Sequence, residues 1–351
     1  MRQRPNEQEQ SGGENSTNLQ AGGDLVYIGP SREEVKEIAL AVFQQNFLEL
    51  RGIAEDVALA RADKITTEFL TKMYAEAPEA AERFSDPDVQ RSVFNAQREY
   101  ACSGEDDLGQ VLVDLLVDRV KEDDRNLRTL ALNEAITAAP KLTEAQRRAI
   151  ALAFLVRYTR VPAILPNAQS VIDVRLRGTM LTLPVPTEPL RDVDFQHIEY
   201  VGAGAVSISE VGLGDAIRTS QTSAFTNGFS AEQMPEDLRD SPLRHRLLMP
   251  CFRNPENFQL QVPATQDVDD LIKTLGAEHL RSSVVQVQEL GVLSGAEVEA
   301  DLKARAPDVA ALFEEWNGTA LKNVTLTSVG LALGHAYWRR FGGDAPLSVW
   351  L

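Results

Sequence analysis

Few side chains in this sequence are suited to acid–base or nucleophilic chemistry at neutral pH. The chain of 351 residues has only four histidines and two cysteines. No two histidines are spaced as His-x3-His or His-Glu-x2-His, the patterns that hold zinc on one face of a helix. We therefore expect no metal centre and no cofactor. The histidines are His197, His245, His279 and His335.

The nearest cysteine and histidine, His245 and Cys251, supply the enzymatic alternative. A cysteine nucleophile needs a base at its sulfur and surroundings that favour the thiolate, and the arginines on either side of His245 would help with the second need. Cys251, however, lies between Pro250 and Phe252 after an apolar run, which is typical of a buried, inert thiol. An enzyme with a dispersed active site in the second half, around these two residues, is therefore kept as the alternative.

Other patterns that resemble ligand sites have simpler explanations. Gly202-Ala203-Gly204 lacks the third glycine and the alternating strands and helices of a dinucleotide-binding fold, so it predicts a flexible turn. The acidic runs 105–107 and 122–124 lie beside expected helix ends, where the helix dipole explains the carboxylates. The sequence contains no GxxxxGK[ST] phosphate-binding loop. These stretches therefore indicate neither a nucleotide nor a metal.

Residues 17–29 have an unusual composition for their place in the chain. Two glycines in the middle allow a tight turn, and residues 25–28 form a short apolar strand candidate. A short strand is not stable alone, because its backbone N–H and C=O groups need partners. We interpret this stretch as a possible assembly segment. Its residues are Asn18, Gln20, Gly22, Gly23, Asp24, Leu25, Val26, Tyr27 and Ile28.

Three arrangements of this segment are open. It can pair with the apolar residues 347–351 of the same chain, which would simply close the fold. It can pair with copies of itself, with asparagine and glutamine side chains stacked in ladders. It can also add to the sheet edge of a partner protein. The last two arrangements would make it a functional assembly element.

The composition limits the classes of partner. Hydrophobic residues make up 43% of the chain and charged residues 25%, which is ordinary for a globular protein. The net charge of -17 disfavours nucleic acid and anionic membranes, since both require a basic surface. Two distant cysteines fit a reducing compartment, and the polar N-terminus has no signal-peptide core. We expect a cytoplasmic protein whose partner is another protein or itself, with no nucleic acid and no membrane.

Hydrophobic residues recur at helical spacing along most of the sequence. Capping-box patterns, in which a serine or threonine is followed three residues later by glutamate or glutamine, begin at Ser31, Thr143 and Ser294. The predicted fold class is mostly α. We expect a helical bundle or irregular helical array, with a short N-terminal β segment and a short C-terminal strand at 347–351.

Changes in composition suggest five parts. Residues 1–16 are polar and predicted to be a disordered tail, and 17–30 are the short β segment. Residues 31–160 are predicted to form a helical domain. Prolines crowd residues 161–194, which read as a linker or irregular segment. Residues 195–351 are predicted to form a second, mostly helical domain.

Several stretches together resemble a known family. They are Gln20-Ala21-Gly22-Gly23-Asp24 with its following strand, residues 34–39, Asp86-Pro87-Asp88 and residues 326–330. The chain is similar to an uncharacterised bacterial protein family in which a Gly/Gln-rich N-terminal strand precedes a helical body. The resemblance covers most of the chain and is weakest in the Pro-rich stretch.

The resemblance implies a bacterial, cytoplasmic protein and carries no activity. Related Gly/Gln-rich N-terminal strands occur in bacterial conflict and signalling proteins, which suggests a role in defence or stress. We therefore predict a non-catalytic interaction, regulatory or assembly protein, and an enzyme is the less favoured interpretation.

Overall fold

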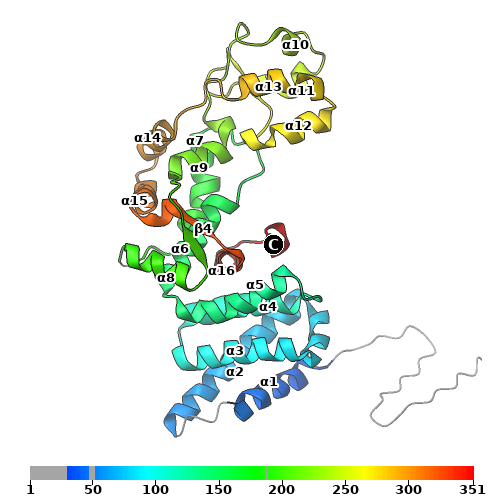
Figure 1. Cartoon of the computed structure of the whole chain (residues 1–351), viewed down its shortest axis with the longest axis vertical. Coiled ribbons are helices and arrows are strands. Elements are labelled where there is room, and N and C mark those ends of the chain that lie inside the picture. Colours follow the sequence, from blue (N-terminus) through cyan, green and yellow to red (C-terminus); the bar gives the residue numbers. More distant parts are fainter. Residues whose placement is uncertain (1–29, 47–51, 187) are drawn as a thin grey trace, which may run out of the picture.

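The computed structural model describes residues 30–46, 52–186 and 188–351, which form an elongated, mostly helical molecule (Figure 1). The predicted fold class is confirmed, because helices dominate the described residues. The strands among these residues form two short antiparallel pairs, β1 with β4 and β2 with β3. None of the described helices is long and apolar enough to cross a membrane.

The first five α-helices of the described chain stack in layers at one end of the molecule (Figure 1). They are α1 (Arg32–Asn46), α2 (Ile53–Glu76), α3 (Pro87–Ser103), α4 (Asp106–Val120) and α5 (Leu127–Ala138). The next helix, α6 (Glu144–Tyr158), lies in the middle of the molecule and packs against α16. The later elements continue toward the other end before the chain returns. They are α7 (Ala168–Ser170), α8 (Asp192–Tyr200), β1 (Gly204–Val206), α9 (Leu213–Ser220), α10 (Glu236–Arg239), α11 (Arg244–Leu247), β2 (Leu248–Pro250), β3 (Phe258–Leu260), α12 (Val268–Leu275), α13 (Arg281–Gln288), α14 (Gly295–Arg305), α15 (Ala310–Gly318), β4 (Val324–Leu326) and α16 (Ser328–Arg339).

The predicted capping boxes are present at the starts of α1, α6 and α14. The Ser31 amide donates to Glu34 Oε2 at 2.7 Å, and the Glu34 amide donates to Ser31 Oγ at 3.3 Å. Thr143 with Gln146 makes the same reciprocal pair at α6, and Ser294 makes it with the third residue of α14. Each box satisfies backbone donors that the first helical turn leaves without partners.

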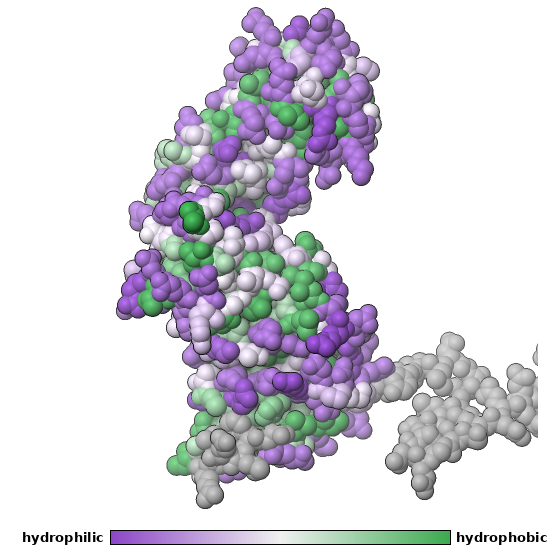
Figure 2. All heavy atoms as spheres, viewed as in Figure 1, coloured by the Kyte–Doolittle hydropathy of each residue, from purple (hydrophilic) through white to green (hydrophobic). Residues whose placement is uncertain are grey.

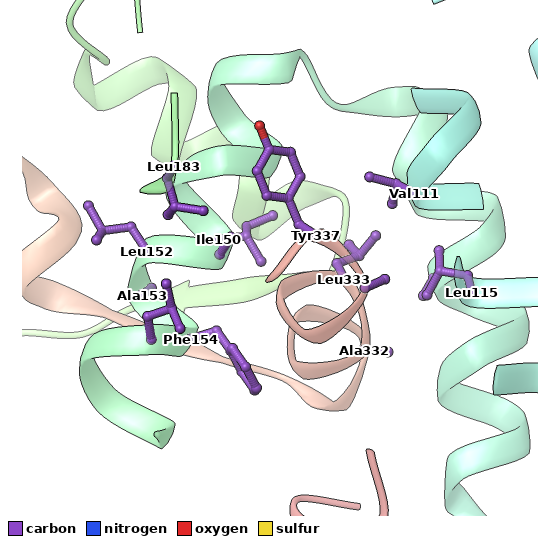
Figure 3. Close-up of a cluster of buried hydrophobic side chains, with 14 of the residues drawn as sticks. Val111, Leu115, Ile150, Leu152, Ala153, Phe154, Leu183, Ala332, Leu333 and Tyr337 are labelled. Carbon is purple, nitrogen blue, oxygen red and sulfur yellow. The ribbon is translucent and has the colours of Figure 1, made fainter. Parts of the chain in front are cut away.

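The C-terminal helix α16 packs into the first part of the chain. It lies against α4, α5 and α6. Figure 3 shows apolar side chains of α4 and α6 on either side of those of α16. Gly334 permits this approach, since a Cβ there would lie 2.6 Å from the Cβ of Phe154. The large apolar cluster therefore runs from Val35 to Leu347 and takes in residues from both sides of the Pro-rich stretch.

The Pro-rich segment 161–194 is held to this cluster by a buried arginine. Its residues Val171–Arg177 form a π-helical turn. Arg175 reaches back to the C-terminal end of α6, where Nη2 donates to the carbonyls of Leu155 and Thr159 at 2.5 and 2.6 Å. Burial lowers the pKa of Arg175 to about 10. The guanidinium thus caps carbonyls that α6 cannot satisfy itself. The predicted division into domains stays a prediction.

A second apolar cluster occupies the far end of the molecule. It is built from residues between Phe229 and Val287, on α10–α13 and the β2–β3 pair. On the face in Figure 2 hydrophilic residues gather toward the two ends, and hydrophobic ones are exposed in the middle. This face is hollowed between the far end and the layers that contain α4 and α5.

The prediction of a C-terminal strand at 347–351 is wrong. Residues Leu347–Val349 form a 3-10 turn, in which the amides of Val349 and Trp350 donate to Pro346 and Leu347. A turn of this kind places Leu347 and Trp350 on one side, three residues apart. Leu347 enters the large cluster, and the Trp350 ring packs at 4.8 Å from that of Phe154. Burial of these two side chains outweighs the weak strand preference of a five-residue apolar run.

Candidate functional site

The predicted assembly segment lies outside the described residues, and the structure shows where it joins the body. The described chain begins at Pro30, whose carbonyl accepts a hydrogen bond from Tyr74 Oη at 3.0 Å. Arg32 Nη2 donates to Thr71 Oγ1 at 2.7 Å. Both contacts are with the last turns of α2, so the described chain begins beside the end of α2.

The described strands lie far from this point. α1 packs on α2 and α3, these pack on α4, α4 packs on α16, and α16 packs on α6 and β4 (Figure 1). Layers of helices therefore separate the start of the described chain at Pro30 from the β1–β4 pair.

One edge of the β1–β4 pair carries exposed apolar side chains. The Ser207 amide donates to the Asn323 carbonyl at 3.0 Å, and the Thr327 amide donates to the Ala203 carbonyl at 3.2 Å. Alternate residues of an antiparallel strand face its partner, so the backbone groups of Val206 point away from β4. Val206 is 39% exposed, and the nearby Ile208 and Tyr200 are 100% and 85% exposed. We name residues 200–208 the β1 edge.

The structure does not bring His245 and Cys251 together. Cys251 is 1% exposed, and its Sγ donates to the Thr226 carbonyl at 3.3 Å. The His245 side chain is exposed, and only its main-chain carbonyl makes a bond, from Gln261. No hydrogen bond or ion pair joins the two side chains among the residues that the structure describes. The arrangement shown is not that of a thiol with its base.

Arg339 on α16 joins carboxylates from two other helices. Its Nη2 donates to both carboxylate oxygens of Glu76 at 2.6 Å, and its Nη1 donates to Asp118 Oδ1 at 2.8 Å. Burial alone would raise the pKa of Glu76, but hydrogen bonds from Arg339 and Lys121 outweigh it and lower that pKa to about 2. The pKa of Asp114 shifts in the opposite direction: although its carboxylate accepts from Lys72 at 2.5 Å, burial raises its pKa. These ion pairs tie α16 to α2 and α4.

His335, one turn before Arg339, holds the C-terminal segment. The ring is 1% exposed, and Nε2 lies 2.8 Å from the carbonyl oxygen of Ala345. A carbonyl only accepts, so this nitrogen carries the hydrogen. Nδ1 approaches Asp118 Oδ2 at 3.2 Å without the alignment of a hydrogen bond. The contact between Nε2 and the Ala345 carbonyl holds the C-terminal segment against α16.

This cluster of charges was not predicted from the sequence. A usable signal was present, because Asp114 and Asp118 on α4, and His335 and Arg339 on α16, are each spaced four residues apart. That spacing puts each pair on one helix face. The spacing does not indicate that this face of α4 contacts this face of α16, because more than two hundred residues separate them in the sequence.

The sequence matches one family of known proteins. The model of an uncharacterised protein family matches residues 29–351. The chain belongs to that family. No curated protein and no solved structure matches the chain.

The matched range contains every contact described above, including the Arg339 cluster and the β1 edge. It begins after the predicted strand 25–28, so it supports the resemblance for the helical body and does not confirm the Gly/Gln-rich strand as a family feature. The family is uncharacterised, so membership in it implies no activity for this chain.

Proposed function

We propose that this protein is a non-catalytic assembly protein in which residues 25–28 of one copy pair with a strand edge of a second copy. The observation that carries the proposal is the position of Pro30 beside α2, with layers of helices between it and the β1–β4 pair. The other candidate within the chain, residues 347–351, is a 3-10 turn. If residues 25–28 form the strand that their sequence predicts, their backbone groups need a partner outside the chain.

The β1 edge is the acceptor that we propose on the second copy. Its outward backbone groups can continue an antiparallel ladder by strand addition, which needs main-chain hydrogen bonds and apolar side chains on alternate positions. Val206 and Ile208 offer exposed apolar surface to the alternating side chains of Leu-Val-Tyr-Ile. Exposed apolar groups next to an open edge are unusual in a protein that works alone.

The setting that we propose is the bacterial cytoplasm. Both cysteines are free thiols, and one of them is exposed. A free thiol at the surface suits a reducing compartment. The net charge of -17 keeps the molecule soluble while local apolar contacts hold it together. A role in defence or stress, suggested by the resemblance of the N-terminal segment, completes the proposal.

Light scattering on truncated chains tests the proposal. We compare the full chain of 38.6 kDa with chains that lack residues 1–16 or residues 1–29. The first deletion removes only the polar tail and serves as the matched control. We expect the full chain and the control to have masses of two or more chains, and the second deletion to give a single chain. An oligomer that survives removal of residues 1–29 would overturn the proposal.

A further inference from the structure

A polar groove of about 560 Å³ lies between α3 and α5, with Arg119 from α4 beneath it. The wall from α3 includes Asp88, Arg91 and Ser92, and the facing wall from α5 includes Asn133 and Glu134. Spacings of three and four residues place these side chains on the helix faces that meet at the groove. Its volume is in the range of sites for small molecules.

Arg119 is a buried guanidinium with one unused group. The residue is 2% exposed, Nη2 donates to Asp88 Oδ2 at 2.5 Å, and Nε donates to Asn133 Oδ1 at 2.8 Å. The hydrogen bond from Arg119 lowers the pKa of Asp88, so this pair stays charged. Nη1 is buried and has no hydrogen-bond partner in the described part of the chain. A buried donor without an acceptor destabilises the fold, and an acceptor on a bound molecule would satisfy it.

The groove also carries unpaired charges of both signs on its walls. The pairs Arg119–Asp88 and Arg83–Asp123 neutralise part of the lining. Arg91 on α3 and Glu134 on α5 are exposed, and neither forms a hydrogen bond or an ion pair within the described residues. Opposite charges that line one groove without forming an ion pair suit a ligand that carries both a positive and a negative charge.

The balance of charge argues against other ligands. A polyanion would meet the carboxylates of Asp88, Asp123 and Glu134. A simple cation would find the Asp88 and Asp123 carboxylates already paired with arginines. Among the described residues no group of three or more histidine, cysteine, aspartate or glutamate side chains is placed to hold a metal ion. The polar lining does not favour an apolar molecule.

We propose that this groove binds a small zwitterion of the α-amino-acid type, with its carboxylate on Arg119 Nη1 and Arg91 and its ammonium toward Glu134. The carboxylate accepts from the unused guanidinium donors, and the ammonium donates to the opposite wall. The proposal is independent of the assembly through residues 25–28.

Titration calorimetry on the full chain tests the proposal. The zwitterionic probes are L-glutamine and glycylglycine, and the single-charge probes are sodium acetate and methylammonium chloride at the same ionic strength. We expect at least one zwitterion to bind, and both single-charge probes to bind at least about tenfold more weakly, since each satisfies one wall only. Acetate that binds as tightly as the zwitterions would overturn the proposal, as would a lack of response to both zwitterions.

Exposed variants keep the test independent of folding. Arg91→Gln and Glu134→Gln each remove one wall charge, and we expect each to weaken zwitterion binding about tenfold. Arg98→Gln, on the same helix α3 but outside the groove lining, is the matched control and leaves binding unchanged. Equal affinities for the Arg91 and Arg98 variants would contradict the assignment of the groove.

Discussion

The indole Nε1 of Trp350 donates a hydrogen bond to the main-chain carbonyl of Tyr158, at 2.6 Å. This contact fixes the C-terminal turn to the end of α6, and Arg128 adds a bond to the main-chain carbonyl of Leu351 at 3.2 Å. The last residues are therefore committed to the helical core and are not available as a strand. We therefore expect residues 25–28 to pair between chains.

The two thiols should differ sharply in reactivity. Cys102 is exposed, whereas Cys251 is buried and bonded to the Thr226 carbonyl. We expect a thiol-specific reagent to modify Cys102 in the native protein and Cys251 only after unfolding, because modification needs an accessible thiolate. Mass spectrometry of the labelled peptides measures both sites. Rapid native modification of Cys251 would instead revive the enzymatic alternative around His245.

Gly334 should tolerate no side chain, because α16 and α6 touch there. A Cβ at this position meets the Phe154 side chain at 2.6 Å and the Ile150 carbonyl at 3.3 Å. We expect Gly334→Ala to lower the free energy of unfolding by about 1–3 kcal/mol, measured in urea. Gly318→Ala is the control, since its Cβ has no neighbour within 4 Å. Equal losses for the two variants would contradict the close packing of α16.

Loss of one partner of the ion pair between Arg148 of α6 and Glu315 of α15 should lower the free energy of unfolding strongly. Replacement of both partners with apolar residues should lower it much less. Both guanidinium Nη atoms contact the Glu315 carboxylate, the second at 3.0 Å, and the Arg148 side chain is 5% exposed. We expect Glu315→Gln to cost about 3 kcal/mol, because it leaves a buried charge without its counterion. The double variant Arg148→Met, Glu315→Leu should recover most of that loss.

The exposed neighbour Glu314 supplies the control for this pair. Glu314→Gln should change stability by less than about 0.5 kcal/mol. If urea unfolding shows that the Glu314 and Glu315 variants are equally stable, the pair does not carry the energy that its burial implies.

Acid should weaken the attachment of α16 through Glu76. The pKa of Glu76 is about 2 in the folded chain, against an ordinary value of 4.5 that we take for the unfolded chain. A lowered pKa means that Glu76 stabilises the fold above about pH 4.5, and this contribution is lost as the pH falls toward 2. We expect Glu76→Gln to cost about 2 kcal/mol at pH 7 and almost nothing at pH 2.

The exposed glutamate Glu79 is the matched control for the pH experiment. Glu79→Gln should leave the dependence of unfolding on pH as it is in the parent chain. Asp114 acts with the opposite sign, since burial raises its pKa and protonation relieves its desolvation. A Glu76 variant whose stability falls with acid as steeply as the parent's would contradict the role given to Arg339.

Local features of the fold were predictable from the sequence. The capping boxes at Ser31, Thr143 and Ser294 lie where the pattern placed them, because each depends on residues only three positions apart. The 347–351 strand failed because a short apolar run fits a strand or a buried turn equally well, and contacts with Phe154 decided between them.

The candidate sites depend on contacts between distant parts of the chain. β1 pairs with β4 across about 120 residues, and neither three-residue strand has enough pattern to be recognised alone. The polar residues of α3 and α5 that form the groove have the spacing of an ordinary solvated helix face. Only the packing of α4 beneath them shows that Arg119 has a buried donor to offer.

The most direct test of the account is the mass of the chain when the backbone of the predicted strand can no longer pair. Val26→Pro with Tyr27→Pro removes an N–H donor on each side of the strand, and Gly12→Pro with Gly13→Pro makes the same change in the polar tail. By sedimentation velocity we predict an oligomer for the parent and the tail variant, and a monomer of about 38.6 kDa for the strand variant. A strand variant that sediments like the parent, or a parent that is already monomeric, would contradict it.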